Sequence, residues 1–237
     1  MTPQRSLHDL LNRSMVAGLV SFFALFIWTP QLHAESYVAG QLGMTFPQPL
    51  KNGDVTQHGL GGLTISDQPL KNSIMLGAKF GHYLSRARWI GVETGLSFAN
   101  PHVKEGSLKF SGTGGSATVS GLSGLSQRMI IWDVATLVVR YPGFRLQPYV
   151  GIGPALYFAN LKGPAAPPGQ SATAIGMNVE GGARYYVTRR VALFGELQYH
   201  RARLGYTSND DNPAADPFGF RATYSALTAS VGVSYHF

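Results

Sequence analysis

The 237-residue chain contains no cysteine, and only 13% of its residues are charged. The missing cysteine excludes disulfide frameworks, thiolate metal sites, cysteine nucleophiles and a lipidated N-terminal cysteine. Hydrophobic residues make up 44% of the chain, yet no apolar run reaches the roughly 20 residues that a membrane-spanning helix needs. The sequence therefore argues against a helical membrane protein.

The N-terminal segment has the pattern of a secretory signal peptide. Two arginines precede an apolar run of about 14 residues, which is followed by a proline and by the small residue Ala34. We predict a signal peptide at residues 1–34, cleaved after Ala34, and a single domain at residues 35–237.

Residues 35–237 alternate between apolar and polar side chains in segments bounded by turn residues, which is the pattern of β-strands. Eight such segments are predicted, at residues 36–46, 73–84, 88–98, 128–141, 146–159, 173–187, 191–206 and 223–237. Each reaches the roughly 9 to 11 residues that a tilted strand needs to cross a bilayer. Composition alone also allows a soluble β-sandwich, because its strands alternate in the same way.

The connections between these segments alternate in length. Three are short (SRAR, PGFR and TRR), and the others are long and rich in Gly, Ser, Pro, Asn and Asp. The long connections lie at about residues 47–72, 99–127, 160–172 and 207–222. Short turns at one end and long loops at the other are the rule for outer-membrane barrels. The predicted fold is all-β, an eight-stranded antiparallel transmembrane up-and-down β-barrel. Residues 111–126 are expected to form a mobile surface loop or an extension of the third and fourth strands.

Charged side chains show which face of each strand points inward. A cation on the lipid side at the bilayer midplane costs about 2 to 4 kcal/mol, so charges within the strands must point into the barrel. This test predicts a polar network in the lumen, made of Lys79, Glu93, Glu180, Arg184, Glu196 and Gln198. Eight strands leave room inside only for side chains, so the prediction is a structural ion network. A gated polar conduit or proton path is the alternative.

The fourth predicted strand is ambiguous, because Asp133 and Arg140 lie on opposite faces of an otherwise apolar run. Arg140 is expected to snorkel from the lipid face near the turn. Aromatic residues are expected to form two interfacial belts. The belt at the short turns would contain Tyr83, Trp89, Tyr141, Phe144, Tyr149, Tyr185, Tyr235 and Phe237. The belt at the long loops would contain Phe46, Phe98, Tyr157, Phe158 and Tyr206.

The final strand, ALTASVGVSYHF, carries apolar residues on one face and small or polar residues on the other. It resembles the closing strand of bacterial outer-membrane barrels. The stretches YPGFRLQPYVGIGPALYF (141–158) and GMNVEGGARYYVTRRVALFGELQY (176–199) are similar to the small porin-like family of the OmpA transmembrane domain and OmpX. The resemblance implies export through the periplasm to the outer membrane. It also implies that Tyr235 and Phe237 are the signal read by the barrel-assembly machinery.

Enzymatic and metal sites find little support. Lipid A deacylases are also eight-stranded barrels, with a serine nucleophile two residues after a histidine, but here His200 is followed by Ala202. A hydroxyl without a base in reach is not activated, so His200 is predicted to be an interfacial histidine. His236 is predicted to be a lumen-side residue near the periplasmic rim. The acidic loop with Asp210, Asp211 and Asp216 lacks the ligand spacing of an EF-hand. No catalytic, cofactor or metal site is predicted.

The predicted function is that of a non-enzymatic outer-membrane barrel with a structural or surface-interaction role. The alternatives are a lipid A-modifying, deacylase-like enzyme and a narrow-channel, porin-like protein. The expected partners are outer-membrane lipid, lipopolysaccharide and, during biogenesis, the barrel-assembly machinery. Nucleic acid is not an expected partner, although the net charge is +7, because Lys and Arg are scattered rather than clustered. A monomer is expected.

Overall fold

The computed structural model describes residues 35–55, 64–65, 70–101, 106–112, 115–122, 126–162, 170–208 and 219–237. The predicted signal peptide and the acidic loop at Asp210, Asp211 and Asp216 lie outside these residues. Within the described parts of the chain, no helix is both long and apolar enough to cross a membrane.

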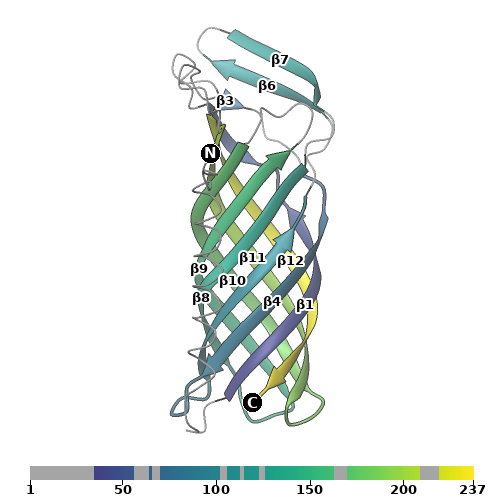
Figure 1. The fold of residues 1–237 in the computed structure, drawn as a ribbon, viewed down its shortest axis with the longest axis vertical. Helices are drawn as coiled ribbons and strands as arrows, with labels where there is room; N and C mark the ends of the chain where they lie inside the picture. The colour runs from purple at the N-terminus through teal and green to yellow at the C-terminus, as the bar shows by residue number, and fades with distance from the viewer. Residues whose placement is uncertain are drawn as a thin grey trace, which may run out of the picture. The chain divides into compact units, whose positions relative to one another are not determined.

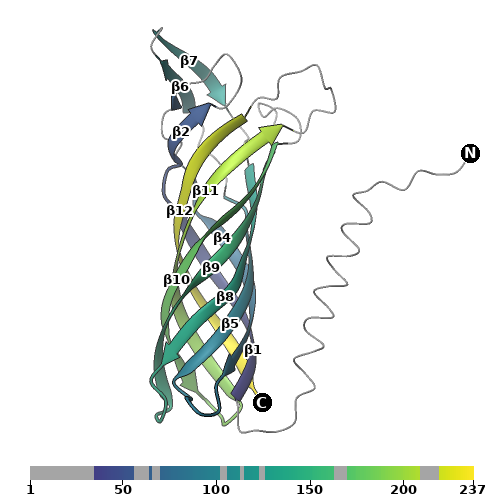
Figure 2. The same ribbon diagram turned by 90° about the vertical axis from the view of Figure 1, so that its left-hand side faces the viewer.

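Eight long strands form a closed antiparallel barrel (Figures 1 and 2). In barrel order they are β1 (Glu35–Pro47), β4 (Ser73–Tyr83), β5 (Ile90–Ala99), β8 (Ser126–Arg140), β9 (Leu146–Lys162), β10 (Gln170–Tyr186), β11 (Val191–Ser208) and β12 (Gly219–His236). Each strand pairs with the next, and β12 returns to pair with β1 from Tyr37↔His236 to Pro47↔Ala226. Closure satisfies the backbone hydrogen bonds within the sheet, as a bilayer demands. The predicted fold class is confirmed.

Side chains alternate between a buried interior and an exposed apolar exterior. Outward-facing apolar side chains come from all eight strands and include Leu42, Leu76, Val92, Leu137, Ile152, Ile175, Leu197 and Val231. The interior is filled by polar, charged and aromatic side chains in the half near the short turns. It is filled by an apolar and tyrosine-rich cluster in the half near the long loops.

A β-bulge in β8 resolves the ambiguity of the fourth predicted strand. On β5, Gly95 pairs with Asp133 and Glu93 pairs with Thr136, so Thr94 alone faces two residues of β8. One extra residue reverses the facing of all residues that follow it. Both Asp133 and Arg140 are therefore buried inside, each 4% exposed. The expectation that Arg140 snorkels from the lipid face was wrong, because simple alternation misses an inserted residue.

The two predicted aromatic belts are correct only in part. The rings of Trp89, Tyr141, Phe144, Tyr185, Tyr235 and Phe237 are exposed around the short-turn end, as Phe46 and Phe98 are toward the long loops. Four predicted belt members instead point into the barrel and are almost completely buried, namely Tyr83, Tyr149, Tyr157 and Tyr206. Nearness to a strand end does not decide which face of the strand a ring occupies.

Four short strands outside the barrel join the two longest connections into one sheet. They are β2 (Lys51–Val55), β3 (Thr64–Ile65), β6 (Gly106–Gly112) and β7 (Gly115–Leu122). The sheet continues from the end of β12 through β2, β3 and β6 to β7. Figure 1 shows β6 and β7 beyond the end of the barrel opposite the C-terminus. The described part of segment 111–126 thus lies mainly in a separate hairpin, rather than in an extension of the third and fourth barrel strands.

The short connections are tight turns at residues 84–89, 141–145 and 187–190. Gly143 has a φ of 113°, a conformation that L side chains rarely adopt, in the middle of its turn. In the turn before β11, the Thr188 hydroxyl accepts hydrogen bonds from the backbone N–H groups of Arg190 and Val191. These turns, Glu35 and Phe237 share one end of the barrel, which we call the short-turn end.

Candidate functional site

A buried ion cluster crosses the lumen on the short-turn side of its middle. The Lys79 ammonium on β4 lies 2.7 Å from Glu93 Oε1, 2.9 Å from Glu180 Oε2 and 2.8 Å from Glu196 Oε2. These carboxylates come from β5, β10 and β11, so one lysine ties four strands together. All four charged side chains are at most 2% exposed.

Arg184 extends the ion cluster toward the short-turn end. Its Nη2 lies 3.0 Å from Glu93 Oε2 and donates to the Tyr37 hydroxyl at 2.6 Å, while its Nη1 donates to the Tyr83 hydroxyl at 2.7 Å. The guanidinium also stacks 4.0 Å above the Tyr37 ring centre. Such cation–π and charge-assisted contacts are strong in a water-poor interior.

Two tyrosines and two amides supply further donors to the carboxylates. Tyr37 donates a short hydrogen bond to Glu93 Oε2, and Tyr149 donates to Glu196 Oε2 at 2.6 Å. The side-chain amides of Asn178 and Gln198 each approach Glu180 Oε2 at 3.4 Å. The interior therefore supplies donors to the three carboxylates from five of the eight barrel strands.

The three carboxylates can be compared with a metal site. One oxygen each from Glu93, Glu180 and Glu196 lies within 4.8 Å of the others, and carboxylate oxygens suit hard cations. The Lys79 ammonium, however, already contacts all three. The structure thus favours an internal counterion over a bound metal.

His200 lies deeper toward the long loops and inside the barrel. Its Nε2 is 3.3 Å from Asp133 Oδ1, its ring packs edge-on against Tyr157, and the residue is 2% exposed. The prediction of an interfacial histidine was wrong. Ala202 is also buried, so both positions compared with the deacylase motif face the lumen.

A second polar cluster closes the short-turn end. Glu35 forms an ion pair with Arg140, and its Oε1 lies 2.7 Å from His236 Nδ1. The Tyr186 hydroxyl donates to Glu35 at 2.7 Å, and the Arg140 guanidinium stacks 3.6 Å from the Tyr83 ring centre. The structure places His236 inside the barrel at this rim, where the sequence had suggested.

The half of the lumen near the long loops is mostly apolar, with Gln127 and the Asp133–His200 pair as buried polar groups. Its side chains are mostly alanines, aliphatic residues and tyrosines, including Met129, Ile131, Tyr157, Leu204, Tyr206 and Tyr224. Leu50 and Leu70, from the first long connection, join the same cluster and are almost fully buried. The ion cluster is therefore separated from the long-loop end by an apolar layer.

The structure brings together all six side chains proposed for the lumen network. Lys79, Glu93, Glu180, Arg184 and Glu196 form the ion cluster, and Gln198 is 1% exposed beside Glu180. Sequence reasoning missed the tyrosines that complete it. Strand parity could have found Tyr83, because Lys79 and Tyr83 are four residues apart on one strand and share a face.

Tyr235 and Phe237 lie on the outer face with their rings 6.4 Å apart, and their role as an assembly signal stays a prediction.

Fold and interior together define a small transmembrane β-barrel with a side-chain-filled lumen. A model for the outer membrane protein beta-barrel domain matches residues 17–237. The chain belongs to this family, and it is a protein of the outer membrane. A comparison with curated protein sequences finds no match.

Solved structures show the same architecture. The outer membrane protein OprG from Pseudomonas aeruginosa is 15% identical, with a TM-score of 0.59, over 86% of this chain and 96% of that chain. The outer membrane protein AlkL, solved by solid-state NMR in DMPC bilayers, is 18% identical, with a TM-score of 0.57, over 89% of this chain and 93% of that chain. At these identities the likeness is one of fold.

Proposed function

We propose that this protein is a non-enzymatic outer-membrane barrel with a closed lumen, which acts through the surface formed by its long loops. The observation that carries the proposal is the ion cluster around Lys79, together with the apolar layer beyond it. Opening a path would require separating buried ion pairs, and an uncompensated buried charge is strongly unfavourable. A stiff, plugged cylinder suits a structural or display role better than transport.

The sheet at the long-loop end supports a surface role. Residues from two connections are held in register by strands β2, β3, β6 and β7, so they form one surface. Among the described strands, β7 pairs only with β6 and is the edge of this sheet. An unpaired strand edge can accept an extended segment of another protein. The partner class we favour is therefore an extended segment of a protein at the cell surface.

The lumen argues against the two alternatives. The deacylase motif requires a serine two residues after the histidine, whereas this chain has Ala202 there and His200 faces inward against Asp133. A porin-like path would have to pass both the ion cluster and the apolar layer.

Conductance across a planar bilayer tests the closed lumen. The refolded protein should give no stable conductance steps in 1 M KCl. Steps from the unaltered protein would overturn the proposal. Lipid A mass spectra from cells with and without the protein should be identical, and a change in acyl-chain number would make it an enzyme.

Surface proteolysis tests the display role. Protease added to intact cells should cleave within residues 99–127 and leave the barrel strands intact. Cleavage at residues 84–89 in place of this segment would reverse the topology and end the proposal.

A further inference from the structure

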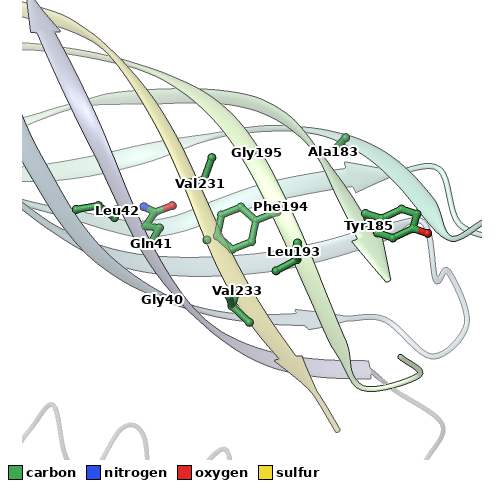
Figure 3. Close-up of a pocket in the computed structure, with 11 residues that line it drawn as sticks. Gly40, Gln41, Leu42, Ala183, Tyr185, Leu193, Phe194, Gly195, Val231 and Val233 are labelled. Atoms are coloured by element: carbon green, nitrogen blue, oxygen red, sulfur yellow. The ribbon is translucent and has the colours of Figure 1, made fainter. Parts of the chain in front are cut away.

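The outer wall of the barrel has an apolar hollow next to a turn that carries two arginines. The hollow has a volume of about 680 Å³ and lies across β1, β12, β11 and β10 (Figure 3). Its outward-facing lining includes Gly40, Leu42, Tyr185, Leu193, Gly195 and Val233. Gly40 and Gly195 form low points in the wall, because a Cβ built on either would meet nothing within 4 Å.

The turn beside this hollow, residues 187–190, carries Arg189 and Arg190. Both side chains are exposed, and the turn joins the two strands that supply Tyr185 and Gly195. Their backbone positions are held by the Thr188 hydroxyl and by a hydrogen bond from the His236 N–H to the Arg190 carbonyl, at 2.6 Å. The turn contains no acidic residue, so it presents two neighbouring positive charges at the membrane edge.

We propose that this hollow and turn bind one anionic glycerophospholipid of the periplasmic leaflet, with an acyl chain in the hollow and the phosphate at Arg189 and Arg190. Short turns of outer-membrane barrels face the periplasm, which puts the turn at that leaflet. The proposal is independent of the function of the lumen and long loops.

The depth of the hollow matches one leaflet. Leu193 and Gly195 follow Arg190 by three and five residues, which is about 10 to 17 Å along the strand. At a strand tilt of about 45° this corresponds to roughly 7 to 12 Å below the turn, within the inner half of a hydrocarbon core about 30 Å thick. The exposed ring of Tyr185 lines the hollow beside Leu193, its partner on the neighbouring strand.

Charge favours a lipid over a second copy of the chain in this hollow. A twofold dimer through this face would use the same patch on both copies. It would bring four arginines of the two 187–190 turns toward each other, and like charges oppose association. An anionic headgroup instead neutralises them, as basic clusters at membrane surfaces do.

Native mass spectrometry of the full mature chain tests the site, with phosphatidylglycerol and phosphatidylethanolamine added separately to the detergent-solubilised protein. The wild type should retain one phosphatidylglycerol in preference to phosphatidylethanolamine. R189Q/R190Q should weaken that retention about 30-fold. The matched control, R86Q/R88Q, removes two exposed arginines from another short turn and should change retention less than threefold.

Filling the hollow tests the acyl-chain part of the site without changing charge. Gly195→Leu should lower phosphatidylglycerol retention at least tenfold, and Gly205→Leu, near the other end of the same strand, should leave it unchanged. Gly40→Leu provides the same test if Gly195→Leu does not fold, as judged by heat-dependent migration on a detergent gel. The proposal would be overturned if the wild type retained both lipids equally. It would also be overturned if R86Q/R88Q lost as much phosphatidylglycerol as R189Q/R190Q, or if the variant with the filled hollow retained as much as the wild type.

Discussion

Glu35 and His236 join the first and last strands of the barrel through a contact of 2.7 Å between Glu35 Oε1 and His236 Nδ1. The backbones of Ser36 and Phe237 exchange two hydrogen bonds beside it, at 3.1 and 2.9 Å. Tyr186 and Arg140 bind the same carboxylate from β10 and β8. The contact between Glu35 and His236 forms only when β1 pairs with β12 and closes the barrel. It therefore couples this closure to the positions of β8 and β10.

His236→Ala should destabilise the closed barrel, because it removes a hydrogen bond to a charged group at the seam. We expect the free energy of unfolding to fall by about 1 to 2 kcal/mol. The decrease is smaller than for a fully buried hydrogen bond to a charged group, because Glu35 is partly exposed. The temperature at which the folded band disappears on a detergent gel measures the effect. Arg145→Gln, in an exposed turn position, serves as the control and should leave this temperature unchanged. Identical melting of His236→Ala and wild type would contradict the role of this contact.

Lys79→Met should be the most damaging single substitution in the lumen. It leaves Glu93, Glu180 and Glu196 without their shared counterion, and removing one partner of a buried ion pair costs about 3 to 5 kcal/mol. Urea unfolding in lipid vesicles, followed by tryptophan fluorescence, measures the change.

Two further variants make the Lys79 measurement specific. Lys71→Met changes the same residue type at an exposed position and should alter stability by less than about 0.5 kcal/mol. Adding Glu196→Gln to Lys79→Met should recover part of the loss, because it lowers the uncompensated charge. Strict additivity of the two substitutions would show that Lys79 and Glu196 are not energetically coupled.

Deleting Ala135 should abolish correct assembly. The bulge holds one extra residue of β8 opposite Thr94, whose hydroxyl donates to the Asp133 carbonyl at 2.9 Å and accepts from Trp132 Nε1 at 3.0 Å. Without that residue, the end of β8 reverses its facing and Arg140 turns toward lipid. The folded, heat-modifiable band should be lost. Ala135→Leu keeps the residue count and should still give a folded band, and a folded deletion variant would refute the argument.

Gly81→Leu should disrupt the ion cluster through Tyr37. Tyr37, Gly81 and Glu93 are neighbours across β1, β4 and β5, and the Tyr37 ring crosses Gly81 to reach Glu93. A Cβ at Gly81 would lie 2.3 Å from a Tyr37 ring carbon. Overpacking costs about 1 to 3 kcal/mol, and the hydrogen bond to Glu93 would be lost in addition. The urea concentration at the unfolding midpoint should be lower for Gly81→Leu and unchanged for Gly40→Leu. Equal midpoints for the two variants would contradict the proposed role of Gly81.

Strand alternation was sufficient to predict most of this barrel. The eight predicted segments match the observed barrel strands to within a few residues, because a lipid face and a packed face impose a period of two on every strand. Counting every second residue from Lys79 and from Glu180 identifies the inward face of β4 and β10. The same count failed for Arg140, because the extra residue in β8 cannot be recognised from the alternation of apolar and polar residues.

The aromatic residues and the long connections show where local pattern is insufficient. Tyr149 and Tyr157 lie near strand ends, as interfacial aromatics do, but each is on the inward face and each hydroxyl has an interior acceptor. The pairing of β3 with β6 joins two connections that are distant in sequence. No period within either connection encodes that partner.

The sequence by itself determined the membrane barrel, its strand count and the class of side chain on each face. The reason is that alternate residues of every strand must suit lipid on one face and the packed lumen on the other. Only the tertiary structure decided which charges meet. Lys79 reaches its three carboxylates across strands whose relative stagger depends on the β8 bulge and on closure of β1 against β12. Those offsets arise from the closed cylinder as a whole, so no single segment contains them.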